Sequence, residues 1–114
     1  MGMLESLKKS NQFKKALKEK KVHTDYFSIF AAKNFFKPKY KTNLLISFVM
    51  KKKIGNAVKR NKIKRRLRNI MNEAVKKISI KFDYSYLIIA KSTMLNNNYT
   101  DIKEVLFESF KKIK

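Results

Sequence analysis

The sequence predicts an α+β fold, a two-layer α/β sandwich in which helices pack on one small central sheet. Residues 23–32, 43–50 and 84–91 are rich in the aromatic and branched apolar side chains that favour strands. Between and around these stretches, apolar residues recur at helical spacing. Strand and helix patterns that alternate within 114 residues are typical of one α+β domain.

Helical periodicity predicts three helices. A short first helix covers about residues 11–19, with Ser10 as its candidate N-cap. The second runs from about residue 56 to residue 78. Thr100 and Asp101 open the third, and its apolar residues fall on one stripe: Ile102, Val105, Leu106, Phe110 and Ile113.

The strands differ in their patterns. Residues 23–32 alternate between a polar-aromatic set and an aliphatic set, Tyr26, Ser28 and Phe30 against Phe27, Ile29 and Ala31. Residues 43–50 are nearly all apolar, which favours a central strand covered on both faces. Residues 33–42 hold the only proline and predict an exposed hairpin connection. The order is α-β-β-α-β-α, or α-β-β-β-α-β-α if the first strand is split.

The net charge of the chain indicates which class of molecule it binds. With 29 basic and 8 acidic residues the formal net charge is +21, so nucleic acid or an anionic membrane surface is the expected partner. A hydrophobic content of 44% argues against a disordered basic tail. The absence of cysteine excludes disulfides and thiolate metal sites. No apolar run is long enough for a membrane span or a signal core, so we expect a cytoplasmic protein.

We expect a single domain. Met1 and Gly2 precede a second methionine, Met3, which we interpret as the native start. Residues 1–2 are then a cloning remnant, and residues 3–114 form one RNA-binding domain.

The stretch from Lys51 to Arg68 carries the strongest signal. Ten of its eighteen residues are basic, none is acidic, and it contains all four arginines of the chain. Arginine binds phosphate through a rigid planar fork, whereas lysine is a mobile point charge. Gly55 lies where the lysine run ends and the helical pattern begins, which indicates a turn or a close backbone approach.

On the second helix the side chains separate into three arcs. Five residues project within an arc of about 140°: Arg60, Asn61, Lys64, Arg65 and Arg68. An apolar arc holds Ile63, Leu67, Ile70, Met71 and Ala74. A third arc, expected to be solvated, holds Lys59, Lys62, Arg66, Asn69 and Glu73. A helix that only needed to stay in solution would require no patterned basic face.

The motif Lys53-Ile54-Gly55-Asn56-Ala57-Val58, continued by Arg60-Asn61-Lys62-Ile63-Lys64-Arg65 and Arg68, resembles the signature of the bacterial ribonuclease P protein component. The resemblance implies the α-β-β-β-α-β-α order and an unusual left-handed crossover around the basic helix. It also implies a large RNA subunit that catalyses cleavage with Mg²⁺, while the protein assists removal of the 5′ leader of precursor tRNA. No obligate protein partner and no membrane contact are implied.

The residues themselves offer no catalytic constellation. The acidic residues are scattered, and none lies between Asp25 and Glu73. A lone His23 is more typical of a strand edge than of a base or a metal site. We therefore assign no catalytic residue to the chain, and metal ligands on the protein stay unassigned.

Two RNA-binding surfaces are expected. For the catalytic RNA we predict eight residues: Lys51, Lys52, Lys53, Arg60, Asn61, Lys64, Arg65 and Arg68. For the leader we predict four aromatic residues beside basic ones: Phe13, Tyr26, Phe30 and Tyr86. The family resemblance implies a leader cleft between the first helix, the sheet face and the last helix. It places Phe13 and Phe30 there, while Leu17 departs from an often aromatic position.

Rival interpretations come from other classes of protein. A ribosomal or other structural RNA-binding protein would share the size and charge but would need no open aromatic cleft. A protein-only nuclease would need clustered carboxylates. A peripheral membrane protein would need a broad lipid-facing stripe, which the basic helix does not offer.

Overall fold

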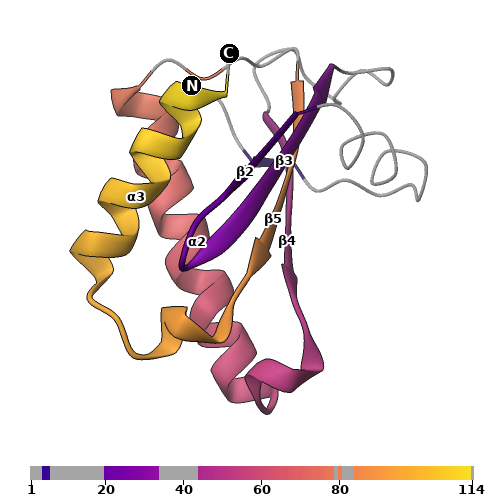
Figure 1. The fold of residues 1–114 in the computed structure, drawn as a ribbon, viewed down its shortest axis with the longest axis vertical. Helices are drawn as coiled ribbons and strands as arrows, with labels where there is room; N and C mark the ends of the chain where they lie inside the picture. The colour runs from indigo at the N-terminus through magenta and orange to yellow at the C-terminus, as the bar shows by residue number, and fades with distance from the viewer. Residues whose placement is uncertain (1–3, 6–19, 34–43, 79, 81–83, 114) are drawn as a thin grey trace.

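The computed structural model describes residues 4–5, 20–33, 44–78, 80 and 84–113 (Figure 1). The elements in chain order are β1 (Leu4–Glu5), β2 (Lys20–His23), β3 (Phe27–Lys33), β4 (Leu44–Met50), the 3-10 turn η1 (Lys52–Ile54), α2 (Ala57–Lys77), β5 (Tyr84–Ala90), the 3-10 turn η2 (Ser92–Leu95) and α3 (Tyr99–Lys112). The predicted first helix lies outside the described residues, as does nearly all of the predicted hairpin connection.

The strands form one five-stranded sheet in the order β1-β4-β5-β3-β2. Neighbours β4 and β5 are parallel, and α2 lies between them in the chain, so α2 forms a crossover connection from one to the other. The predicted split of the first strand is confirmed, although β2 begins at Lys20 and not at residue 23. Thr24 makes the break, because its hydroxyl and its amide both donate to the Phe27 carbonyl, at 2.8 and 2.9 Å.

Both α2 and α3 cover the same face of the sheet, the helix-side face (Figure 1). The buried residues of α2 are the five of the predicted apolar arc, so its helical phase is confirmed. They pack with Ile102, Leu106 and Phe110 of α3 and with alternate residues of the strands. Within the described ranges, no helix is both long and apolar enough to cross a membrane.

The start of α3 differs from the prediction. Asn98 is its N-cap and accepts a hydrogen bond from the Thr100 amide at 2.8 Å, so the helix opens at Tyr99. An asparagine cap satisfies a free amide as well as threonine does. Lys103 of α3 pairs with Glu73 of α2 at 3.3 Å. Burial, and then the charge of Glu73, raise the pKa of Tyr99 beside this pair, with Lys103 opposing.

Candidate nucleic-acid interface

The turn before α2 fixes where the basic helix begins. Ile54 is buried and donates its amide to the Lys51 carbonyl at 3.0 Å, which anchors η1. Gly55 follows with φ 146°, a backbone conformation that side chains with a Cβ rarely adopt. Asn56 then caps α2, because its Oδ1 accepts the Lys59 amide at 3.0 Å. The glycine therefore turns the chain so that the helix starts directly beside the lysine run.

Most of the predicted basic surface lies next to η1 and on α2 between Arg60 and Arg68. Lys51 and Lys53 are exposed before the helix, and four residues of the predicted arc are exposed on it: Asn61, Lys64, Arg65 and Arg68. Arg60, at the margin of the arc, is half-buried, and its Nε has no hydrogen-bond partner within the described part of the chain. The backbone of Lys52 lies in η1 beside these residues. We name these eight residues the α2 basic face.

The charge at the start of α2 is unfavourable for the protein alone. The first turn contains no acidic residue, and Lys59 and Arg60 lie in or next to it. The amino end of a helix carries a partial positive charge, which favours anions and disfavours cations. A bound phosphate would accept hydrogen bonds from the free amides at the start of the helix, and its negative charge would offset the charges of Lys59 and Arg60. The arrangement therefore favours a polyanion as the ligand of this end of the helix.

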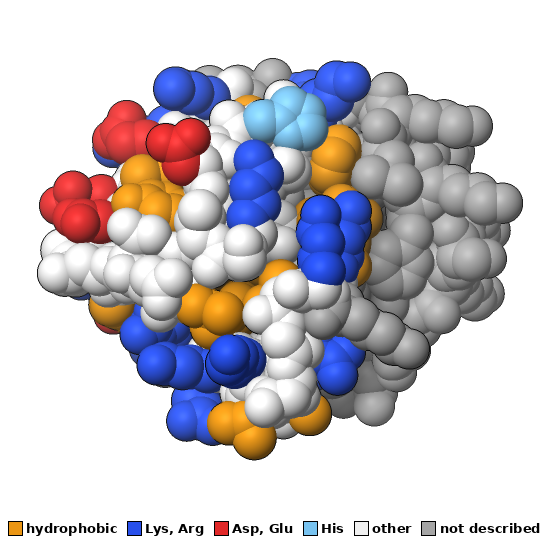
Figure 2. Space-filling model, turned by 60° about the horizontal axis from the view of Figure 1, so that its bottom comes forward, with side chains coloured by type: hydrophobic (Ala, Val, Ile, Leu, Met, Phe, Trp, Pro, Cys, Tyr) orange, Lys and Arg blue, Asp and Glu red, His pale blue; other side chains and the backbone are white. Residues whose placement is uncertain are grey.

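The exposed acidic residues that the structure describes lie outside α2. Figure 2 shows one group of lysine and arginine side chains along the lower margin of the molecule and others at its top and centre, with the acidic side chains together at the upper left. Three exposed acids, Asp101, Glu104 and Glu108, lie on α3. The one acidic residue of α2, Glu73, is half-buried and paired with Lys103, so a polyanion would meet no exposed carboxylate on α2.

Arg66 does not belong to a solvated arc, so that prediction was wrong. Its Nη1 donates to the carbonyls of Met94 at 3.0 Å and Asn97 at 3.3 Å, in and after η2. A long side chain at the margin of the buried arc can fold over the core and reach a neighbouring loop. Arg66 therefore ties α2 to the loop between β5 and α3.

We expect Arg66→Ala to lower the free energy of unfolding by about 1–3 kcal/mol, because two carbonyls lose a charged donor. Urea unfolding followed by circular dichroism would measure the loss. Lys62→Ala is the matched control, since Lys62 is an exposed cation on the same helix and should change stability little. Equal stability of the two variants would show that the Arg66 contacts contribute nothing.

The assignment of Tyr86 to the leader surface was wrong. Strand register pairs Phe30 with Leu87 and Ala31 with Tyr86, so Tyr86 and Phe30 lie on opposite faces of the sheet. Tyr86 is 2% exposed and packs edge-on against Phe110, with ring centroids 5.0 Å apart. A ring enclosed in the core cannot stack on a nucleotide.

The other predicted aromatic residues have three different outcomes. Phe13 lies outside the described residues. Tyr26 precedes β3, accepts the Lys91 amide at 2.9 Å and packs, half-buried, against the helix-side core. Phe30 is half-buried on the opposite face of the sheet, against Ala32, Leu87, Val49 and Ile89. We call this the outer sheet face, and Phe30 is its one predicted leader residue among those described.

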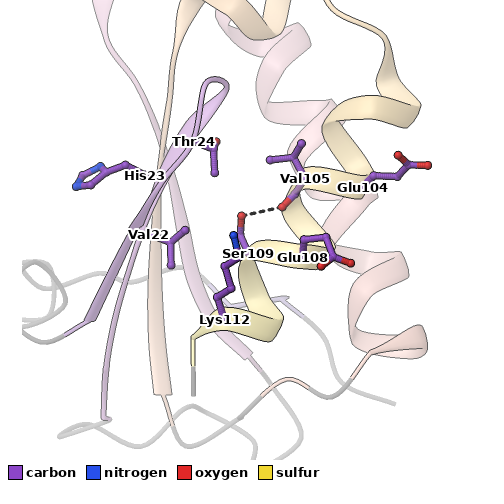
Figure 3. A pocket seen from close by; sticks show the side chains of 8 residues that line it. All are labelled: Val22, His23, Thr24, Glu104, Val105, Glu108, Ser109 and Lys112. Carbon is purple, nitrogen blue, oxygen red and sulfur yellow. Dashed lines mark hydrogen bonds between the residues drawn. The ribbon is translucent and has the colours of Figure 1, made fainter.

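The concavity beside α3 does not contain Phe30. A groove of about 340 Å³ between β2 and α3 is lined by Val22, His23, Thr24, Glu104, Val105, Glu108, Ser109 and Lys112 (Figure 3). Two carboxylates in this groove would repel a phosphate chain. The expectation that the last helix would wall a leader cleft together with Phe30 is therefore corrected, since α3 covers the other face of the sheet.

Two polar residues next to Phe30 were missed. Lys21 is its direct partner on β2, and His23 is the direct partner of Ser28. The imidazole and phenyl rings are nearly perpendicular, with centroids 5.8 Å apart. The alternation of Lys21 and His23 was the available signal, but it indicated a face only once β2 was known to begin at Lys20.

Comparisons with known proteins agree with one another. The family model described as Ribonuclease P matches residues 1–114. A Ribonuclease P protein component of Mesoplasma florum is 33% identical over 94 residues, 82% of this chain and 80% of that protein. One from Bacillus cereus is 30% identical over 107 residues, covering 93% and 88%.

Solved structures show the same fold. The Staphylococcus aureus RNase P protein superposes with a TM-score of 0.76 at 26% identity, covering 96% of this chain and 94% of that one. The RNase P protein from Thermotoga maritima superposes with a TM-score of 0.77 over 96% and 98%, at 24% identity. The latter likeness concerns the fold alone.

Proposed function

Because this chain belongs to the family of ribonuclease P protein components, we propose that it binds a large catalytic RNA and the 5′ leader of precursor tRNA. In this proposal the RNA cleaves the leader, and the protein improves substrate binding. The chain is then an accessory subunit of an endoribonuclease in tRNA 5′ maturation.

The α2 basic face is the observation that carries the proposal. It combines exposed arginines with the cation-rich start of a helix that lacks acidic compensation. Arginine forks bind phosphates bidentately, and the free amides of the helix start add further donors. A folded RNA offers closely spaced phosphates to such a surface, so we assign this face to the catalytic RNA.

The outer sheet face is the proposed leader surface. Single-stranded RNA is bound by aromatic rings on a sheet beside basic residues. Phe30 is the half-buried aromatic residue that the structure describes on this face, and Lys21 lies opposite it on β2. The proposal therefore assigns the two RNA molecules to two different parts of the surface.

Mg²⁺ enters the proposal through the RNA. In the described part of the chain, His, Cys, Asp and Glu form no group of three or more that could hold a metal ion. No step of the cleavage is therefore assigned to a metal held by the described residues.

Reconstitution tests the proposal directly. The purified protein should restore cleavage of precursor tRNA by a ribonuclease P RNA at Mg²⁺ concentrations where that RNA alone is nearly inactive. A basic ribosomal protein of similar size is the matched control. If positive charge alone were sufficient, that protein would restore cleavage equally well. If both proteins restored cleavage to the same extent, or neither did, the proposed role would be wrong and a structural RNA-binding role would be favoured.

We expect Phe30→Ala to weaken binding of leader-bearing precursor tRNA to the reconstituted holoenzyme by about 1–3 kcal/mol, the loss of one stacked base. Affinity for mature tRNA should hardly change. Binding of both tRNAs is measured at saturating protein, so that assembly defects do not contribute. Phe107→Ala removes another half-buried ring, on α3, and should affect both tRNAs alike. If Phe30→Ala weakened binding of both tRNAs equally, Phe30 would have a purely structural role.

A further inference from the structure

The outer sheet face carries a pair of polar side chains beside Phe30. Alternation along β2 places Lys21 and His23 on the same face, and their direct partners on β3 are Phe30 and Ser28. Direct cross-strand partners have their Cβ atoms about 4.5–5.5 Å apart, and diagonal neighbours remain within reach of long side chains. The ammonium group, the imidazole and the phenyl ring therefore belong to one small area.

His23 is held in a defined orientation. Its Nδ1 shares a hydrogen bond with the Ser28 hydroxyl at 2.7 Å. Its ring stands at 81° to that of Phe30. Figure 3 shows the imidazole pointing away from α3. With Nδ1 engaged, Nε2 is the remaining polar atom of the ring, and it has no hydrogen-bond partner in the part of the chain that the structure describes.

The local charge favours an anion. Lys21 and His23 are exposed, and Lys21 forms no ion pair with a described residue. The described residues of the outer sheet face on β3, β4 and β5 are polar or apolar without an acidic group among them. An anion placed between Lys21 and His23 would therefore meet no like charge from these strands.

We propose that Nε2 of His23 and Nζ of Lys21 bind one phosphate of the leader, whose nucleotide stacks on Phe30. This inference rests on the proposed leader function of the outer sheet face. It adds a phosphate subsite made by β2 to the stacking residue on β3. Ser28 is a positioning residue, because its hydroxyl holds the imidazole so that Nε2 is directed outward.

The chemistry requires only a donor at Nε2. When Ser28 donates to Nδ1, the neutral ring carries its hydrogen on Nε2, and the protonated ring carries one there as well. Either form donates to a phosphate oxygen, and Lys21 supplies the compensating charge. A stacked base and a bound phosphate together would hold one nucleotide in place without selecting which base it carries.

The test combines protein variants with leaders that carry one methylphosphonate, which replaces a charged phosphate oxygen by a methyl group. Each leader linkage is modified in turn, and binding to the reconstituted holoenzyme is compared with that of mature tRNA. For the wild-type protein we expect a loss of about 3- to 10-fold at one linkage. His23→Ala should lose affinity for the unmodified leader, and modifying that same linkage should then cost this variant less than it costs the wild-type protein, because only the Lys21 contact remains to be lost.

Conservative variants separate phosphate binding from packing. Glutamine places its amide nitrogen near the position of Nε2, whereas asparagine places its own near Nδ1. His23→Gln should therefore retain most of the leader affinity, and His23→Asn should lose as much as His23→Ala. Lys21→Ala should lose affinity at the same linkage, and the control Lys112→Ala, an exposed lysine of α3, should not.

The outcomes distinguish the subsite from the function on which it rests. Independent, additive losses at every linkage, or equal behaviour of His23→Gln and His23→Asn, would overturn the subsite. A wild-type holoenzyme that prefers leader-bearing tRNA while His23→Ala changes nothing would also overturn the subsite and leave the leader function standing. A wild-type holoenzyme without any preference for the leader would overturn both.

Discussion

Replacing Arg65 and Arg68 together with alanine is expected to weaken binding of the catalytic RNA strongly while the domain stays folded. Both side chains are exposed, and neither has a hydrogen-bond partner among the described residues that the change would orphan. Each lost phosphate contact is expected to cost about 1.5–3 kcal/mol, the range for hydrogen bonds to charged groups. Because phosphate contacts release counterions, the slope of log K against log salt should fall by about 2.

The measurement is RNA affinity across a salt series, with urea unfolding of the same samples. Lys111→Ala is the matched control, because it removes an exposed cation from α3, on the side of the acidic residues. Arg66→Ala should show the opposite pattern: it should lower the free energy of unfolding and leave the salt dependence of RNA affinity unchanged. If Lys111→Ala reduced the slope as much as each arginine change does, binding would depend on net charge alone and the α2 basic face would not be a site.

The phase of α2 could be predicted from sequence because a helix has a fixed angular step. Once Ile63 and Leu67 are assigned to the core, the exposed positions of Arg65 and Arg68 follow from geometry. The exception is Arg66, at the margin between core and solvent. Its partners are carbonyls 28 and 31 residues away, and no pattern in the helix itself indicates that a loop will lie there.

The faces of the strands could not be predicted in the same way. In β5 both alternating sets are apolar, Tyr86 and Ile88 on one face and Leu87 and Ile89 on the other. Alternation therefore does not decide which set meets the helices. Register decides it, and a one-residue shift exchanges the faces. Tyr86 was assigned to the wrong face of the sheet for this reason.

Gly55→Val is expected to lower the free energy of unfolding by about 1–3 kcal/mol, the cost of holding a residue in a sparsely populated backbone conformation. The φ of 146° at Gly55 is one that side chains with a Cβ rarely adopt. A Cβ built there would lie 2.7 Å from Cδ of Lys59. That contact involves a flexible side chain, which can move aside, so the backbone conformation supplies most of the cost.

Gly55→Ala tests this division, because alanine adds the Cβ without the two methyl groups of valine. If backbone strain dominates, the two variants should lose similar stability in urea unfolding, and both should lose more than Lys62→Ala. Catalytic-RNA affinity should fall in parallel, since the turn places Lys53 beside the first residues of α2. If Gly55→Val kept wild-type stability and RNA affinity, the glycine would be incidental. If valine cost much more than alanine, crowding by the side chain would be the cause and the strain argument would be wrong.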